Sequence, residues 1–425
     1  MLAFLALQAL LFWLNAWPVA RRPWGDEIMY LDLAQRWARG EAARLEPLWP
    51  PLYPRLMAAM LELGDASLLT LRLLQVGLLL LAALALRGLA ERLLGSATAG
   101  RWAAALFLLD PQVAAFAQYY WPEALHLALF LGSLWLLALH GRSWGAVALA
   151  GLLLGLALLA KSVLLPFLPL LLLPLGFELG WRPGLARAGL ALGLALLVTA
   201  PAAISNGRHH GLWAVADSSR FNLWVGLNDR SRRNLVDEVV GDEYNRWRES
   251  APDLAGRDRL LRERTAALVT QRGLPGVLAD QLGKQYLRLF DRDSFFTDQL
   301  PGGAIVAQGY GCVAAPARLA RALRLAAWGL YAVVLVGASF GLARVARAPS
   351  PWLVALLLFL AGNLLLFLGL HVKTRYRLGF LPVLDLLAAA ALARCGQPPR
   401  AVGWLCGALL ALLALGLAFG GPLLG

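Results

Sequence analysis

The sequence predicts an all-helical protein that crosses a membrane about eleven times. Of its 425 residues, 59% are hydrophobic and only 15% are charged, and the mean hydropathy is +0.62. A soluble core cannot bury that much apolar surface. The apolar residues also gather in runs of about 20, the length that a helix needs to cross the hydrocarbon core of a bilayer.

The apolar runs set the expected spans and the division of the chain. We interpret the first run as an uncleaved span, because no basic segment precedes it and it is long for the core of a signal peptide. An N-terminal transmembrane module (1–204) contains the first outer loop (21–67), and an extracytoplasmic loop domain (205–322) and C-terminal transmembrane helices (323–425) follow it. The expected spans are 2–20, 68–92, 100–117, 122–140, 144–160, 162–178, 184–204, 323–343, 351–370, 377–394 and 401–421.

Arginine in the short loops predicts the orientation. Residues such as Arg92, Arg142 and Arg344 fall on alternate connections of one parity, and the positive-inside rule makes that side cytoplasmic. Arg21 and Arg22, just after the first span, violate the rule. Both long stretches outside the membrane then face the periplasm or the cell exterior.

The charge composition indicates lipid partners. The formal charge of +13 comes almost wholly from arginine, since Lys161, Lys284 and Lys373 are the only lysines. Arginine in place of lysine, with abundant Ala, Gly and Leu, is typical of a GC-rich bacterial genome. We therefore expect a bacterial inner (plasma) membrane protein. Its basic balance suits anionic membrane lipids and phosphorylated lipids, and we expect no nucleic acid partner.

The two outer stretches are predicted to be mostly helical. A short amphipathic helix begins at Asp26 and ends at Gly40, and its wide apolar face predicts that it lies in the membrane interface. The proline-rich segment from Glu46 to Pro54 then returns the chain toward the bilayer, since prolines at that density forbid continuous helix. The long loop shows helical patterns near 257–272 and 275–290.

Ionisable side chains gather on the predicted outer face. Carboxylates beside lipid are costly to desolvate, so the adjacent pair at 26 and 27 is either well solvated or has a purpose. Adjacent helical residues point about 100° apart, so the two carboxylates cannot share one role, and we favour Asp26 as a base. If the 371–377 run is extended, Arg375 and Arg377 lie on one face. The candidates are Asp26, Glu27, Glu123, Lys161, His371, Lys373, Arg375 and Arg377.

Each candidate also has a purely structural interpretation. Asp26 after Gly25 fits a helix N-cap, and Glu123 at a span's start favours the helix dipole. Lys161 near a span end can extend to the head groups. The basic 371–377 run can hold ordinary anionic lipid, although an outer basic cluster runs against the positive-inside rule.

Several short motifs, in this order, resemble those of the GT-C membrane glycosyltransferases. More narrowly, they are similar to the branch of the protein O-mannosyltransferases and lipid A aminoarabinose transferases. The layout covers nearly the whole chain, but Glu46 is followed by Pro47 where the aminoarabinose enzymes have a lysine. The motifs are Gly-Asp26-Glu27 with Tyr30-Leu-x-Leu-Ala34, Pro-Pro51-Leu-Tyr53-Pro54, Pro122-Glu123, Ala-Lys161-Ser, and Arg375-Tyr376 with Pro382.

The resemblance implies an inverting sugar transfer, outside the cytoplasm, from a polyprenyl-phosphate donor to a protein, lipid or glycan acceptor. Such a transfer needs a base for the acceptor hydroxyl and cations for the departing phosphate. Asp26 and Glu27 are the expected catalytic residues. No cofactor is expected, because cationic side chains can replace a metal at a lipid monophosphate. The expected substrate-binding residues are Tyr30, Glu46, Tyr53, Glu123, Lys161, His371, Lys373, Arg375, Tyr376 and Arg377.

Two other classes fit part of the pattern. An O-antigen ligase or polymerase type of enzyme also pairs a large outer loop with basic residues, but it leaves the acidic pair after the first span without a role. A transporter or flippase for lipid-linked sugars often has inverted repeats and charges near the membrane midplane. This sequence has no visible repeat and few charges within its spans.

Overall fold

The computed structural model describes residues 1–16, 19–41, 47–64, 68–228, 242, 245–251, 253–396 and 400–420. Within these ranges, seven helical segments are long and apolar enough to cross a membrane. They are α4 (Leu69–Leu94), α7 (Glu123–His140), the run Ser162–Leu179, α11 (Trp181–His210), α18 (Ala317–Val345), α19 (Pro351–Gly369) and α21 (Ala401–Phe419).

Shorter apolar helices occupy the other predicted spans. They are α1 (Leu2–Ala16), α5 (Ala97–Leu109), α8 (Trp144–Ala160) and α20 (Leu381–Leu392). The prediction of an all-helical, multi-pass membrane protein is confirmed. The number of crossings stays a prediction, because these four helices are shorter than a bilayer requires.

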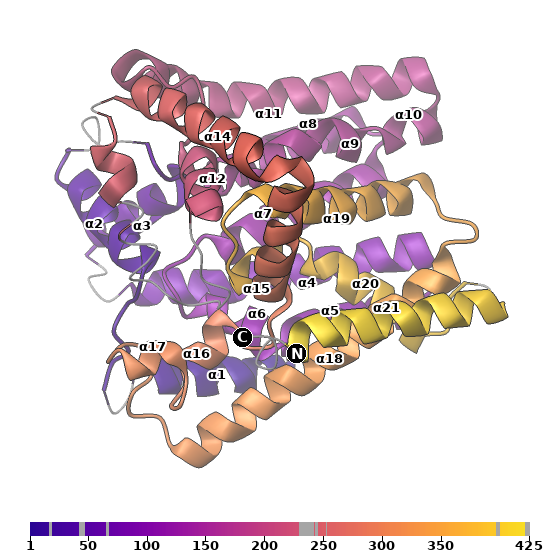
Figure 1. Cartoon of the computed structure of the whole chain (residues 1–425). Helices are drawn as coiled ribbons and strands as arrows, with labels where there is room; N and C mark the ends of the chain where they lie inside the picture. Colours follow the sequence, from indigo (N-terminus) through magenta and orange to yellow (C-terminus); the bar gives the residue numbers. More distant parts are fainter. Residues whose placement is uncertain are drawn as a thin grey trace.

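The bundle packs through small residues. Figure 1 shows α8 beside α11 at one edge and α18 beside α21 at the other. On α8, Ala150, Gly151 and Gly155 are buried, and a Cβ at Gly151 would lie 2.7 Å from the carbonyl oxygen of Ala191 on α11. Without a hydrophobic force between helices in lipid, such close backbone contact is a main source of association.

The described residues of the stretch 21–67, the predicted first outer loop, include two helices. Helix α2 (Asp26–Ala38) begins at Asp26, as predicted, and buries Glu27, Tyr30 and Ala34 on one face. Helix α3 (Leu52–Glu62) was not predicted. It begins just after the double proline and includes Pro54, because the first turn of a helix has no use for the N–H that proline lacks.

The described part of the long loop (205–322), predicted to face outward, is mostly helical, as predicted. It contains α12 (Ser218–Asn228), α14 (Leu254–Gln281), α15 (Leu287–Phe290), α16 (Phe295–Asp298) and α17 (Ala304–Ala307). The two predicted helices join in α14, which bends at Gly273 and continues into a π-helical turn, Leu282–Tyr286. In Figure 1, α14 crosses in front of α12 and leads down to α15. Helices α12 and α14 of this loop therefore lie at the same end of the helix bundle as α2 and α3.

Candidate active site

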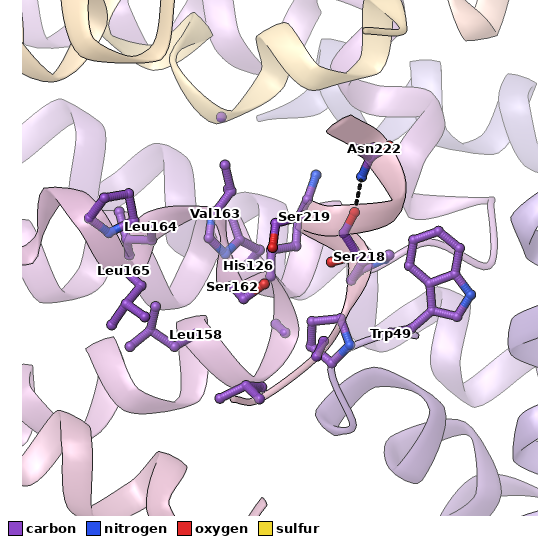
Figure 2. A pocket seen from close by; sticks show the side chains of 18 of the residues that line it. Trp49, His126, Leu158, Ser162, Val163, Leu164, Leu165, Ser218, Ser219 and Asn222 are labelled. Carbon is purple, nitrogen blue, oxygen red and sulfur yellow. Dashed lines mark hydrogen bonds between the residues drawn. The ribbon is translucent and has the colours of Figure 1, made fainter. Parts of the chain in front are cut away.

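A cavity of about 480 Å³ opens between α2, the ends of α7 and α8, α12 and α19. This volume is in the range of small-molecule sites. Five of the predicted site residues line it: Tyr30, Glu123, Lys161, Arg375 and Tyr376. Figure 2 shows that its wall combines serine, asparagine and histidine side chains with leucines of the membrane bundle.

The antiparallel packing of α7 and α8 brings Glu123 and Lys161 together. Glu123 is the first residue of α7, and Lys161 caps the end of α8. The Lys161 ammonium donates to Glu123 Oε1 over 3.1 Å. Glu123 is 2% exposed, and its other oxygen, Oε2, has no hydrogen-bond partner in the described part of the chain.

Arg375 lies where the outer loop, α2 and the bundle meet. Its guanidinium donates through Nη2 to Asp26 Oδ2 and stacks on Trp121, with 3.6 Å between Cζ and the ring centroid. Burial alone would lower the pKa of Arg375, but the Asp26 carboxylate raises it above its ordinary value. Its Nε and Nη1 atoms are buried and have no hydrogen-bond partner among the described residues. The cavity wall therefore holds a permanent cation with unused donors.

Arg377 is not part of this wall. Residues Thr374–Gly379 form a 3₁₀-helix, η5, rather than an extended segment. With three residues per turn, positions 375 and 377 point in different directions. Arg377 is buried and donates to Gln112 Oε1 and, over 2.5 Å, to the carbonyl oxygen of Asp291. The expectation that the two arginines share a face is therefore wrong, and Tyr376 lines the cavity instead.

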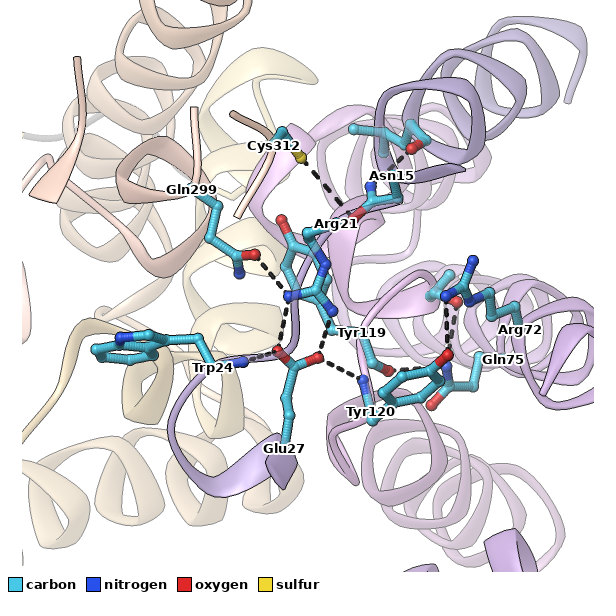
Figure 3. A network of polar contacts seen from close by, with 12 residues as sticks. Asn15, Arg21, Trp24, Glu27, Arg72, Gln75, Tyr119, Tyr120, Gln299 and Cys312 are labelled. Carbon is cyan, nitrogen blue, oxygen red and sulfur yellow. Dashed lines mark hydrogen bonds and ion pairs between the residues drawn. The ribbon is translucent and has the colours of Figure 1, made fainter. Parts of the chain in front are cut away.

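Glu27 is fully buried in a separate network, shown in Figure 3. Its carboxylate accepts hydrogen bonds from Arg21 Nη1 and Nη2 (2.7 and 2.5 Å). It also accepts from the backbone N–H groups of Trp24 (3.1 Å) and Tyr120 (2.9 Å). Arg21 donates in addition to Gln299 Oε1 (2.8 Å) in the outer loop. The network ties the start of α2 to two distant segments, and the adjacent carboxylates do point to different partners.

One other predicted site residue, Tyr53, lies apart from the residues that line the cavity. Tyr53 is buried, and its hydroxyl donates to Gln75 Oε1 on α4 over 2.8 Å. It does not line the cavity. Glu46 falls outside the described residues.

His371 and Lys373 lie between α19 and η5 and are not among the residues that line the cavity. The backbone N–H of His371 donates to the carbonyl oxygen of Asn222 on α12 over 2.6 Å. A Cβ at Gly226, one turn further along α12, would lie 2.5 Å from that same nitrogen, so only glycine allows this approach. The Lys373 ammonium lies 5.1 Å from the ring centroid of Trp24. These contacts hold the segment that leads into Arg375.

The sequence reasoning missed three residues of the wall. Trp121 supports the Arg375 guanidinium, and Asn222 Oδ1 accepts from the Tyr376 hydroxyl over 3.3 Å. His126 is buried in the wall, with Nδ1 3.1 Å from the carbonyl oxygen of Ala157. The sequence did contain a signal for His126: it follows Glu123 by three residues, and residues at this spacing lie on the same face of a helix.

The wall alternates in charge. The Arg375 and Lys161 cations lie 5.3 and 5.8 Å from the ring centroid of Tyr376, and each pairs with a carboxylate. Among the described residues no group of three or more His, Cys, Asp or Glu side chains is placed to hold a metal ion. The cavity wall thus offers two fixed cations to an anion and the Glu123 carboxylate to a hydrogen-bond donor, while Asp26 pairs with Arg375 next to the lining residues.

The chain resembles one solved structure at the level of the fold. Its structure matches that of the oligosaccharyltransferase of Archaeoglobus fulgidus in the apo form, with a TM-score of 0.51 and 15% sequence identity. The match covers 100% of this chain and 55% of that one, so this chain spans about half the length of the oligosaccharyltransferase. No family model and no curated protein matches the sequence.

Proposed function

We propose, from the GT-C fold of this chain and the chemistry of its cavity, that it is an inverting membrane glycosyltransferase. It would move a sugar from a polyprenyl-phosphate donor to an acceptor on the extracytoplasmic face. The resemblance to the O-mannosyltransferase and aminoarabinose transferase branch favours a monophosphate carrier. The acceptor is a protein, a lipid or a glycan.

The observation that carries the proposal is the composition of the cavity described above. One part of its wall holds the charged side chains of Glu123, Lys161 and Arg375 around Tyr376, and another part is apolar. A donor with a charged head and a hydrocarbon tail has the same two parts. The apolar part includes Leu158, Leu164, Leu165, Leu196, Phe359, Leu366 and Phe367.

The cations are suited to the departing phosphate. Arg375 has two unused, buried donors, and a guanidinium can bind two phosphate oxygens at once. The Lys161 ammonium, whose side chain is 21% exposed, supplies a second positive charge nearby. As the bond from the anomeric carbon to the phosphate oxygen breaks, both electrons stay with the phosphate. Charge therefore builds where these cations stand, which is the arrangement that stabilises a transition state.

Asp26 is the residue we assign as the base. The acceptor hydroxyl oxygen bonds to the anomeric carbon from the side opposite the phosphate, and its proton passes to the Asp26 carboxylate. Asp26 is partly exposed, whereas Glu27 accepts four hydrogen bonds and is fully buried. Glu27 has no free oxygen for a proton transfer, so it holds α2 in place while Asp26 reacts.

A reconstituted transfer assay tests the function. Purified protein in liposomes would receive a radiolabelled polyprenyl-phosphate sugar and a membrane extract from its host as the acceptor source. We expect label to move from the carrier to an acceptor, with release of free polyprenyl phosphate. Movement of the intact donor across the bilayer without release would indicate a flippase. Transfer only from a polyprenyl-diphosphate glycan would indicate the O-antigen ligase type.

Cysteine labelling tests which face carries the site. Cysteines introduced at Ser219 or near Ser250 should react with a membrane-impermeant thiol reagent in intact spheroplasts, and one at Ser143 should stay protected. Ser219 lines the cavity, whereas Ser143 caps the opposite end of the α7–α8 pair. The reverse pattern would put the cavity in the cytoplasm and exclude an extracytoplasmic transfer.

A further inference from the structure

We propose that the α7 wall of the cavity, formed by Glu123 and His126, is the subsite that recognises the sugar of the donor. Its side chains would accept hydrogen bonds from groups on the sugar ring, while Arg375 holds the phosphate. The inference rests on the proposed function and assigns a distinct task to residues that the transfer chemistry leaves unused.

Glu123 provides the first acceptor. Its Oε1 takes a hydrogen bond from Lys161 over 3.1 Å, and its Oε2 is buried without a partner in the described part of the structure. A buried polar atom that lacks a hydrogen bond is costly, so this oxygen needs a donor from water or from a ligand. Because Glu123 lines the cavity, a ligand bound there is within the reach of its carboxylate.

His126 provides the second acceptor. Its Nδ1 lies 3.1 Å from the carbonyl oxygen of Ala157, and a carbonyl oxygen can only accept. In the neutral ring Nδ1 therefore carries the hydrogen, which leaves Nε2 as an acceptor. His126 is 4% exposed and lines the cavity together with Ser162 and Ser219, which are drawn with it in Figure 2.

The spacing of positions 123 and 126 along the axis of α7 suits a sugar ring. Positions 123 and 126 lie on one face of α7, separated by a rise of about 4.5 Å. Hydroxyl groups on opposite parts of a pyranose ring are separated by a similar distance. The Lys161 ammonium between the helices adds a donor, so a hydroxyl that both donates and accepts finds both partners.

The two acceptors of the α7 wall cannot form hydrogen bonds with the phosphate or with the polyprenyl tail of the donor. Phosphate oxygens are acceptors, and so are Glu123 Oε2 and His126 Nε2, so no hydrogen bond would form between them. The polyprenyl tail offers no polar hydrogen. Of the donor's three parts, only the sugar carries hydrogen-bond donors, either hydroxyl groups or an ammonium group.

Binding measurements on matched lipids separate sugar recognition from phosphate binding. Protein in nanodiscs would be titrated with a polyprenyl phosphate, a polyprenyl-phosphate hexose and a polyprenyl-phosphate aminosugar. The variants are Glu123→Gln and His126→Phe, with His140→Phe and Glu178→Gln as controls. His140 lies at the far end of α7, and Glu178 pairs with Arg92 over 3.5 Å outside the cavity. Thermal unfolding would verify that each variant is folded.

We expect both cavity variants to weaken binding of the preferred sugar-linked lipid by about tenfold or more, which is the effect of losing one hydrogen bond to a charged or well-placed group. Binding of the bare polyprenyl phosphate should stay within about twofold, and both controls should bind all lipids as wild type does. A loss confined to the aminosugar in Glu123→Gln would identify an ammonium, and a loss with the hexose would identify a hydroxyl.

Equal losses for bare and sugar-linked lipid, or no loss in either cavity variant, would overturn the assignment of the α7 wall. Failure of the wild-type protein to bind any of the three lipids would instead refute the proposed function. Thermal unfolding gives a second criterion. The sugar-linked lipid should raise the unfolding temperature of wild type more than the bare lipid does, and this difference should vanish in His126→Phe.

Discussion

Replacing Arg375 with lysine tests the phosphate site while keeping the charge. The guanidinium pairs with Asp26, stacks at 3.6 Å on Trp121 and retains unused donors at Nε and Nη1. A lysine ammonium can keep the ion pair, but it has no planar surface for the stack and no second donor at a fixed angle. The variant therefore removes the bidentate contact without leaving Asp26 unpaired.

The size of the effect follows from the contact that is lost. Removing one well-placed donor to a developing oxyanion costs about 2.7–4 kcal/mol. Since 1.36 kcal/mol is a factor of ten in rate, we expect kcat/KM of Arg375→Lys to fall by about 10²- to 10³-fold. Charge builds on the phosphate only as it leaves, so most of the loss should appear in kcat and less in donor affinity.

The assay is release of polyprenyl phosphate in nanodiscs, with donor affinity measured separately. Arg220→Lys is the matched control, because Arg220 also pairs with carboxylates, Asp217 and Asp258 at 3.0 and 3.1 Å, but does not line the cavity. Its kinetics should match wild type. Wild-type turnover and donor affinity in Arg375→Lys and in Arg375→Ala would show that this arginine has only a structural or lipid-anchoring role.

The other predictions concern residues around the site. Asp26→Asn should lower kcat by about 10²- to 10⁴-fold in a protein that still folds, with a lower melting temperature because the buried Arg375 loses its counter-ion, and full turnover would exclude Asp26 as the base. Glu27→Gln should destabilise the protein by about 3–5 kcal/mol in thermal unfolding, because it breaks a buried ion pair. Glu91→Gln, at an exposed pair, should cost under about 1 kcal/mol, and equal costs would contradict this reasoning. Gly226→Ala puts a Cβ 2.5 Å from a backbone nitrogen before η5, so it should lower both stability and kcat, whereas Gly283→Ala, with open space around it, should not.

The sequence predicted those parts of the site that depend on local signals. The helix start at Asp26 follows from a glycine before two acidic residues, and it is where the structure places it. Glu123 and Lys161 were assigned to the same membrane face by the hydropathy of two short-looped spans. Their ion pair then follows, because the ends of an antiparallel helix pair meet.

Contacts between residues that are distant along the chain could not be predicted from the sequence. The direction of Arg377 depends on η5 being a 3₁₀-helix, and nothing in the run of residues 371–377 distinguishes that from extended chain. The burial of Arg21 could not be predicted either, because it depends on a contact with Gln299, which is distant in the sequence. In the sequence, Arg21 runs against the positive-inside rule under the predicted orientation, whereas in the structure its charge is paired with Glu27.

The depth of the cavity has a consequence for the carrier lipid. Phe359, in the middle of α19, and Leu370, just past its end, both line the wall. At 1.5 Å per residue they are roughly 16 Å apart, about half the hydrocarbon thickness of a bilayer. For the polyprenyl carrier proposed above, only the isoprene units next to the phosphate would contact this wall, and the rest of the chain would lie among ordinary lipids. A carrier shortened at its far end presents the same surface to this wall, so organisms whose carriers differ in length would supply equivalent substrates.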